Sequence, residues 1–115
     1  MLQISSTSKV YFAKNSIDFR CGIESLSGFC CHKLMQDPMS GAYFVFKNKK
    51  GSQLKVLNYD GVGYFLCLRR FSKGKISWWP IEREECVMEP RELSLLLFGG
   101  SPQTALLPGY WKKFS

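Results

Sequence analysis

The stretch KVLNYDGVGYFLCLRR, residues 55–70, constrains the fold most strongly, because it places strand-like runs on both sides of an Asp-Gly pair. Asp60 and Gly61 both tolerate the backbone conformation that a tight turn between antiparallel strands demands. Gly63 follows closely and indicates a bulge or a close backbone approach. We therefore expect a β-hairpin in which Asp60, Gly61 and Gly63 are architectural and set the register of the strands.

Further strand-like runs surround this hairpin and are joined by short loops. The predicted strands are residues 10–13, 42–47, 53–59, 63–71 and 75–79, with residues 86–88 as a possible edge strand. Loops this short join antiparallel neighbours, so the strands between residues 42 and 79 should form a meander. The run 63–71 is apolar on both faces, which predicts a central strand that is covered on both sides.

Two helices are expected beside this sheet. Asp18 can cap a first helix, whose apolar residues recur every three or four positions as far as about Met35. Pro90 suits the first position of a second helix, and Gly99 can end it. The helices and strands together predict an α+β fold: an antiparallel meander of about four to five strands with two main helices.

The length of the chain favours one domain. A chain of 115 residues with 45% hydrophobic residues supports a single core. We expect one α+β domain over residues 1–100 and a C-terminal arm over residues 101–115. No apolar run approaches the roughly 20 residues that span a bilayer, and the N-terminal residues do not have the pattern of a secretory signal. We expect a cytoplasmic protein without membrane contacts.

Basic residues gather in one quarter of the chain. Residues 47–75 carry eight Lys and Arg residues and one Asp, which equals the formal net charge of +7 for the whole chain. Alternate turns of a meander lie at the same end of the sheet, so the turns NKKGS and SKG should bring their lysines together. This charge indicates an anionic partner, most commonly nucleic acid; the alternative is that the lysines keep sheet edges soluble. The predicted nucleic-acid-binding residues are Lys47, Lys49, Lys50, Arg69, Arg70, Lys73 and Lys75.

Three arginines carry more specific expectations. Arg69 and Arg70 are adjacent, and successive side chains of a strand point to opposite faces. Only one of them can share a face with the lysines, and we expect the other to pair with a carboxylate on the side that a helix covers. Arg20 opposes the helix dipole in the first turn of the predicted helix unless it has a partner. The candidate partners of Arg20, with solvent exposure as the alternative, are Asp18, Asp37 and Asp60.

No group of side chains in the sequence predicts catalysis or a metal site. The chain has one histidine and five cysteines, without a CxxC pair, whereas zinc ligands usually come in pairs two to four residues apart. Cys30, Cys31 and His32 are adjacent, so we expect reduced, buried thiols there. Metal-dependent transfer of a nucleic-acid strand needs converging carboxylates, which the sequence does not indicate. We expect no enzyme, no cofactor and no metal.

Several short motifs follow one another in a specific order. They are Asp18-x-Arg20, Asp37-Pro38-x-x-Gly41, Lys55 followed by Asp60-Gly61-x-Gly63, and Trp79-Pro80. In this order and spacing, from about Val10 to Leu97, the chain resembles the small accessory proteins (TnpB, from the second open reading frame) of the insertion-sequence-66 family of bacterial transposons. The RNA-guided nuclease that is also called TnpB is a different and much larger protein.

The resemblance implies an accessory role in transposition beside a separate, larger transposase. Together with the charge, it leads to a non-catalytic factor that binds the DNA of the element, or the transposase–DNA complex, through the basic end of the sheet. The alternative is a protein adaptor that docks the separate transposase without touching DNA, with the aromatic C-terminal arm as its natural contact. The sequence leaves open whether the chain is monomeric or dimeric and whether it binds DNA or RNA.

Overall fold

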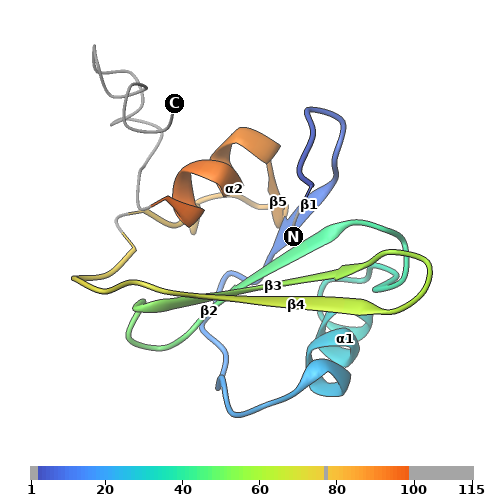
Figure 1. Ribbon diagram of the computed structural model, residues 1–115, viewed down its shortest axis with the longest axis horizontal. Helices are drawn as coiled ribbons and strands as arrows, with labels where there is room; N and C mark the ends of the chain where they lie inside the picture. Colours follow the sequence, from blue (N-terminus) through green and yellow to red (C-terminus); the bar gives the residue numbers. More distant parts are fainter. Residues whose placement is uncertain (1–2, 77, 99–115) are drawn as a thin grey trace.

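The computed structural model describes residues 3–76 and 78–98. Its centre is a five-stranded sheet with the order β4-β3-β2-β1-β5 (Figure 1). The strands are β1 (Val10–Phe12), β2 (Tyr43–Lys47), β3 (Gln53–Tyr59), β4 (Tyr64–Arg70) and β5 (Val87–Met88). β2, β3 and β4 form an antiparallel meander and β5 pairs antiparallel with β1, whereas β1 and β2 are parallel because helix α1 (Ile23–His32) connects them. The predicted α+β class is confirmed, with a mixed sheet.

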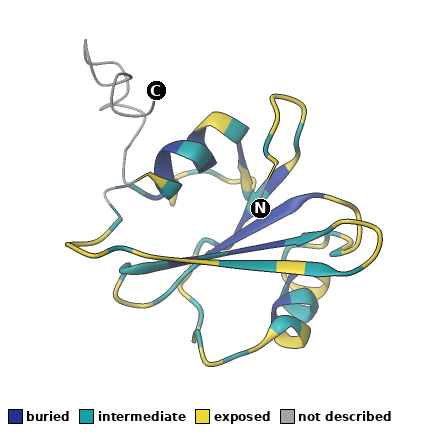
Figure 2. Cartoon of the chain, viewed as in Figure 1, coloured by how far each residue is buried: buried dark blue, intermediate teal, exposed yellow. Residues whose placement is uncertain are grey.

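The two helices cover opposite faces of the sheet. α1 lies against one face and α2 (Pro90–Leu97) against the other, so the fold has three layers (Figure 1). Successive side chains of β3 point to opposite faces, so this strand contributes to the core on both sides of the sheet. Leu54 and Val56 belong to the cluster on the α2 side, and Leu57 belongs to the cluster on the α1 side. Burial is greatest in β1 and β2 and decreases towards β4 (Figure 2).

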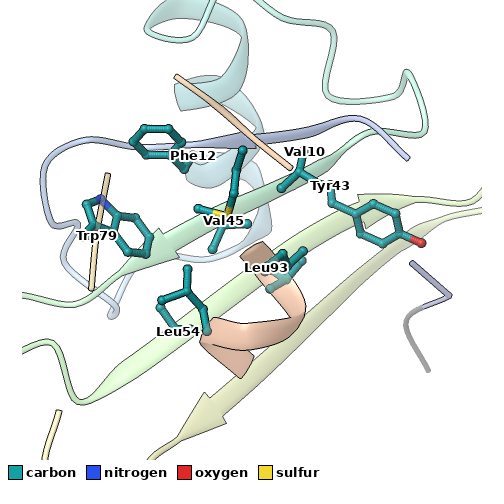
Figure 3. Packing of buried hydrophobic residues seen from close by; sticks show 10 residues of the cluster. Val10, Phe12, Tyr43, Val45, Leu54, Trp79 and Leu93 are labelled. Carbon is teal, nitrogen blue, oxygen red and sulfur yellow. The ribbon is translucent and has the colours of Figure 1, made fainter. Parts of the chain in front are cut away.

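A cluster of aliphatic and aromatic side chains fills the α2 side of the sheet (Figure 3). The Trp79 ring packs edge-on against the Phe12 ring, with 5.8 Å between the centroids. The indole N–H of Trp79 donates a hydrogen bond to the Ala13 carbonyl at 3.0 Å. A buried tryptophan needs such a partner for its N–H group, and this bond fixes the segment after β4 to the end of β1.

The α1 side has its own cluster. Leu26 and Cys30 of α1 are fully buried against the sheet, and the Phe29 ring packs edge-on against Phe46 at 5.9 Å between centroids. Burial raises the pKa of the Cys30 thiol to about 12, so this thiol stays protonated at neutral pH. Cys31 is exposed, so the prediction of buried thiols is wrong at this position, because adjacent helical residues point in different directions.

α1 is shorter than the sequence predicted. It begins at Ile23 and ends at His32, so Asp18 is not its cap. The Asp18 carboxylate instead accepts the N–H group of Arg20 at 2.9 Å, within a turn that precedes the helix. The helix starts late because the segment before it is bound to β3, as described below for the site.

β4 lies at an edge of the sheet, so the prediction that it is central is wrong. The predicted strand over residues 75–79 is wrong as well, since none of its described residues belongs to a strand. This segment leaves the sheet because the Trp79 side chain is buried in the α2-side cluster. β4 therefore exposes Phe65 and Leu68, which are 44% and 57% exposed.

α2 begins at Pro90, as the sequence predicted, and buries Leu93 and Leu96. Leu95 is buried too, although the sequence pattern did not single it out. The glycines that were predicted to end this helix, and the predicted C-terminal arm over residues 101–115, lie outside the described residues. No helix in the described part of the chain is long and apolar enough to cross a membrane.

The start of α2 is fixed by Glu92, which is 5% exposed. Its carboxylate accepts the backbone N–H of Glu89 at 2.8 Å, which satisfies a donor that the helix itself leaves unpaired. The same carboxylate receives two hydrogen bonds from the Arg83 guanidinium, at 2.8 and 2.5 Å. Burial opposes ionisation of Glu92, but the bonds from Arg83 and the Glu89 backbone outweigh it and lower the pKa of this carboxyl group.

The turn between β3 and β4 has the predicted chemistry. The Asp60 carboxylate accepts the N–H groups of Val62 and Gly63, each at 2.9 Å. The hydrogen bonds from Gly63 and then Val62 lower the pKa of Asp60. Gly61 has a φ of +96°, in the region where glycine is favoured over other residues. The turn that was predicted at Asp60 and Gly61 is confirmed; that these residues and Gly63 have an architectural role stays a prediction.

Candidate nucleic-acid interface

The β2–β3 turn and the loop after β4 meet at one end of the sheet, as the meander predicted. The N–H group of Ile76 donates to the Gly51 carbonyl at 2.8 Å, and the N–H group of Phe71 donates to the Ser52 carbonyl at 3.0 Å. The turn at Asp60 lies at the opposite end of the same strands (Figure 1). We call the end that carries the two lysine-bearing turns, residues 47–52 and 69–76, the basic end.

Most of the predicted cations at the basic end are exposed. Lys49 and Lys50 occupy the tip of the β2–β3 turn, and Lys73 and Lys75 occupy the loop after β4. Asn48 shapes the tip, because its side-chain oxygen accepts the N–H group of Gln53 at 3.0 Å. The lysines therefore project from a turn whose backbone is fixed.

Arg69 and Arg70 point to opposite faces, as alternation requires. Arg69 lies on the α2 side, where its Nε donates to the Leu97 carbonyl at 2.7 Å and its guanidinium lies 5.9 Å from the centroid of the Phe98 ring. A cation is favourable at the C-terminal end of a helix, where carbonyl groups lack partners. Among the described residues no carboxylate pairs with this arginine, so the predicted ion pair is wrong there; the end of α2 supplies a backbone acceptor in its place.

Lys47 also lies on the α2 side and contacts the fold. Its ammonium group lies 5.3 Å from the centroid of the Trp79 ring, which is a cation–π arrangement. The predicted group of basic residues is therefore divided by the sheet. Lys47 and Arg69 contact aromatic rings on the α2 side, and Arg70 lies on the α1 side.

A groove of about 1000 Å³ opens on the α1 side of the basic end. Three segments line it: residues 16–20 before α1, residues 48–53 of the β2–β3 turn, and residues 70–71 at the end of β4. Four cations are among its lining residues, namely Arg20, Lys49, Lys50 and Arg70. The lining also includes two aromatic residues, Phe19 and Phe71, and Asp18 is the one carboxylate among the described residues that line it. We call this hollow the basic groove.

The wall formed by residues 16–20 is bound to the sheet at two points. The N–H group of Ile17 donates to the Lys47 carbonyl at 2.9 Å, which prolongs the β1–β2 pairing. Lys55 of β3 extends its ammonium group to the carbonyls of Phe19 and Cys21, at 2.9 and 3.3 Å. The same ammonium lies 4.9 Å from the centroid of the Phe19 ring. These backbone groups therefore bond to β3, and the helix begins only after them.

Asp18 and Arg20 form an ion pair in this wall, which confirms the prediction that Arg20 has a carboxylate partner. Arg20 Nη2 lies 2.7 Å from Asp18 Oδ2, and Arg20 Nε lies 3.1 Å from both carboxylate oxygens. These hydrogen bonds lower the pKa of Asp18 to about 2. The Arg20 side chain is 92% exposed and the Asp18 side chain 58%, so the pair orients Arg20 at the surface and adds little to stability.

The described side chains of this site are groups that can bind an anion. In the described part of the chain, no group of three His, Cys, Asp or Glu side chains is placed to hold a metal ion. Asp18, Asp37 and Asp60 each bond within their own turn, so they do not converge on one point. The basic groove brings together cations, phenyl rings and amide groups, which suits an anionic ligand with flat apolar parts.

Comparison with known proteins assigns the family. The model of the family described as IS66 Orf2 like protein matches residues 8–105. The chain belongs to the IS66 Orf2-like family. It is 35% identical over 99 residues to "Uncharacterized protein y4hO" of Sinorhizobium fredii (strain NBRC 101917 / NGR234), with 86% of each chain covered. It is 32% identical over 91 residues to "Uncharacterized protein y4jC" of the same strain, with 79% of this chain and 78% of the relative covered.

No solved structure shows a significant match to this IS66 Orf2-like chain. Membership of the family implies a role in an IS66 insertion element. The resemblance that the sequence motifs suggested is confirmed over most of the chain.

The motif residues of this family member fall into three structural groups. At the end opposite the groove, the Asp37 carboxylate accepts the N–H group of Met39 at 2.9 Å, and the Gly41 carbonyl accepts Asn58 Nδ2 at 2.9 Å. In the core, Pro80 is buried beside Trp79. The third group surrounds the basic groove and consists of Asp18, Arg20 and Lys55.

Sequence reasoning identified most of the basic groove but did not assign Arg20 to it. The lysine turns and Arg70 were found from charge and from the arrangement of a meander. Arg20 was expected only to pair with a carboxylate, because its place beside Lys49 and Lys50 depends on the bonds between Lys55 and the backbone of residues 19 and 21. The sequence signal that could have indicated this contact is Lys55 itself, a lysine in the middle of an amphipathic strand.

Proposed function

We propose that this protein is a non-catalytic accessory factor for transposition of an IS66-type element and that it binds nucleic acid through its basic end. The observation that carries the proposal is the basic groove, where Arg20, Lys49, Lys50 and Arg70 line one hollow of about 1000 Å³. Its natural ligands are the DNA of the element or the complex of that DNA with the separate transposase. Family membership supports the transposition role, and the groove supports the binding role.

The distribution of charge favours a polyanion over a small anion. Lys73 and Lys75 are exposed on the loop that packs against the β2–β3 turn, so they extend the positive surface beyond the groove. A nucleic acid that follows this surface can place a phosphate near each of several cations, and each contact releases counterions. Lys47 and Arg69 contribute less, since both already contact aromatic rings of the fold.

The test is a charge reversal at the tip of the β2–β3 turn. Lys49→Glu with Lys50→Glu should weaken binding to element-end DNA at least tenfold, because it replaces two phosphate contacts by two repulsive charges. Both side chains are exposed, so the fold should remain intact. Binding is measured by fluorescence anisotropy at moderate salt, and folding is checked by circular dichroism.

The matched control is Lys9→Glu with Lys33→Glu. These lysines are exposed and precede β1 and follow α1, away from the residues that line the groove. The change in net charge is the same, but these two lysines are too far from the groove to contact the bound DNA and act on it only through the screened long-range field. The control should therefore alter the affinity by less than about threefold. Equal losses in both variants, or no binding by the wild-type protein, would contradict the proposal.

The second candidate function is the adaptor that docks the transposase without touching DNA. The observation in its favour is at the end opposite the groove, where Met35, Met39 and Val62 are 77%, 53% and 93% exposed. Exposed apolar side chains that gather in neighbouring loops are typical of protein contacts. Val62→Asp should abolish capture of the purified transposase if this function is correct, whereas the Lys49→Glu/Lys50→Glu variant should retain it.

A further inference from the structure

We infer that the basic groove takes a single strand of nucleic acid in preference to a double helix. The inference rests on the proposed function and narrows it to a class of ligand. Three features of the described residues carry it: the shape of the basic end, the aromatic residues of the groove, and the arrangement of hydrogen-bond donors around them.

The shape of the basic end does not suit insertion into a duplex. The major groove of DNA, about 12 Å wide, admits a protruding helix or a two-stranded ribbon. α1 and α2 lie against the two opposite faces of the sheet, and neither belongs to the segments that line the groove (Figure 1). The β2–β3 turn is bonded to the loop after β4 through Gly51 and Ser52. The cations therefore line a hollow between three segments, and a hollow accommodates a flexible strand better than a rigid cylinder.

The aromatic residues offer surfaces for bases. Phe19 and Phe71 are both among the lining residues of the groove and only partly buried; Phe19 packs against the α1-side cluster and Phe71 against the edge of the α2-side cluster. The ammonium group of Lys55, 4.9 Å from the centroid of the Phe19 ring, holds that ring in position. In proteins that bind single strands, cations follow the backbone while bases stack on aromatic rings. The bases of a duplex are already stacked and paired with one another, so they are not available to stack on these rings.

Hydrogen-bond donors are placed for both parts of a nucleotide. Asp18 occupies Nε and Nη2 of Arg20, and within the described residues Nη1 of this arginine has no partner, which leaves it for a phosphate. Gln53 is among the residues that line the same hollow, and an amide can pair with the exposed edge of an unpaired base. A single strand presents both phosphates and base edges to one groove.

The ligand comparison uses the full chain and four probes of equal length. They are a 12-nucleotide DNA strand, the RNA strand of the same sequence, the corresponding DNA duplex, and a DNA strand whose central residues are abasic. Fluorescence anisotropy at moderate salt should give at least tenfold tighter binding to the single strands than to the duplex. The abasic strand keeps every phosphate but has fewer bases, so it should bind at least fivefold more weakly than the intact strand. The difference in affinity between the DNA strand and the RNA strand shows whether the groove prefers deoxyribose or ribose.

A matched pair of variants assigns this binding to the groove. Lys49→Gln with Arg70→Gln removes two charges that line the groove, whereas Lys73→Gln with Lys75→Gln removes two exposed charges at the same end that do not line it. The first variant should lose at least tenfold in affinity for the single strand and the second less than threefold.

Each contrary result has a distinct meaning. A duplex that binds as tightly as the single strand, or equal binding of the abasic strand, overturns the inference and leaves the proposed function standing. Equal losses in the two variants overturn the assignment to the groove. No binding to any probe overturns the proposed function itself.

Discussion

Lys55→Met should weaken both the fold and the basic groove, because Lys55 links the wall of the groove to the sheet. Its ammonium group donates to the carbonyls of Phe19 and Cys21, at 2.9 and 3.3 Å, and lies over the Phe19 ring. Methionine keeps the apolar stem of the lysine and removes only these contacts. The Asp18–Arg20 pair lies on the same segment, so Arg20 should lose its fixed place beside Lys49 and Lys50.

The size of the effect follows from these contacts. A hydrogen bond to a charged group contributes about 1.5–3 kcal/mol, and the second bond, at 3.3 Å, is the weaker of the two. Lys55 is only partly buried, so solvent competes for its charge. The cation–π contact adds about 0.5–1 kcal/mol. Water solvates the freed carbonyls in the variant and the ammonium group in the unfolded wild-type chain, which offsets part of this sum. We therefore expect the free energy of unfolding to fall by about 2 kcal/mol.

Urea denaturation measures this loss, and Lys75→Met is its control. Lys75 is exposed, so the same chemical change there should alter the free energy of unfolding by less than about 0.5 kcal/mol. Nucleic-acid affinity should fall in the Lys55→Met variant by more than in the control. Equal stability of the Lys55→Met variant and the wild-type protein would refute the conclusion that this lysine holds the wall of the groove.

Two further substitutions test other parts of the structure. Gly61→Val forces a β-branched residue to a φ of +96°, which costs about 1–3 kcal/mol. Differential scanning calorimetry should therefore show a melting temperature several degrees lower. An unchanged melting temperature with lost transposition would instead favour a direct functional role of this turn. Glu92→Gln leaves the Arg83 guanidinium, 33% exposed, without its ionised partner, and should lower the free energy of unfolding by about 2 kcal/mol at pH 7. Because the folded-state pKa of Glu92 is below its ordinary value of 4.5, this stabilisation is complete above that pH and is lost as the pH falls through the folded-state pKa. The difference between the two proteins in urea denaturation should therefore shrink in acid, and a gap that stays constant from pH 7 to pH 3 would exclude the ion pair as its cause.

The parts of the fold that local chemistry determines could be predicted from the sequence. Asp60-Gly61 specified the β3–β4 turn, and Pro90 specified the start of α2, since both depend on residues close together in the chain. The β2–β3–β4 meander followed from short loops, and it placed both lysine turns at one end.

The parts that depend on distant contacts could not be predicted. The stretch 75–79 has the composition of a strand, but Trp79 has a better partner in the Ala13 carbonyl and in the α2-side core. That contact removes the expected neighbour of β4 and makes β4 an edge. The late start of α1 has a similar origin, because Lys55 binds backbone groups 34 and 36 residues away in the chain. Arg20 joins the basic groove for the same reason.

The salt dependence of binding tests the central claim most directly, because phosphate contacts alone produce a steep and predictable slope. For the wild-type protein, the logarithm of the binding constant should fall linearly with the logarithm of salt concentration. A slope of about −3 is expected for a single strand if the four cations that line the groove, Arg20, Lys49, Lys50 and Arg70, contact phosphates. The Lys49→Glu/Lys50→Glu variant should show a slope shallower by about 1.5 or more. Identical slopes in the two proteins, or a wild-type slope near zero, would contradict the account of the basic end as a nucleic-acid-binding surface.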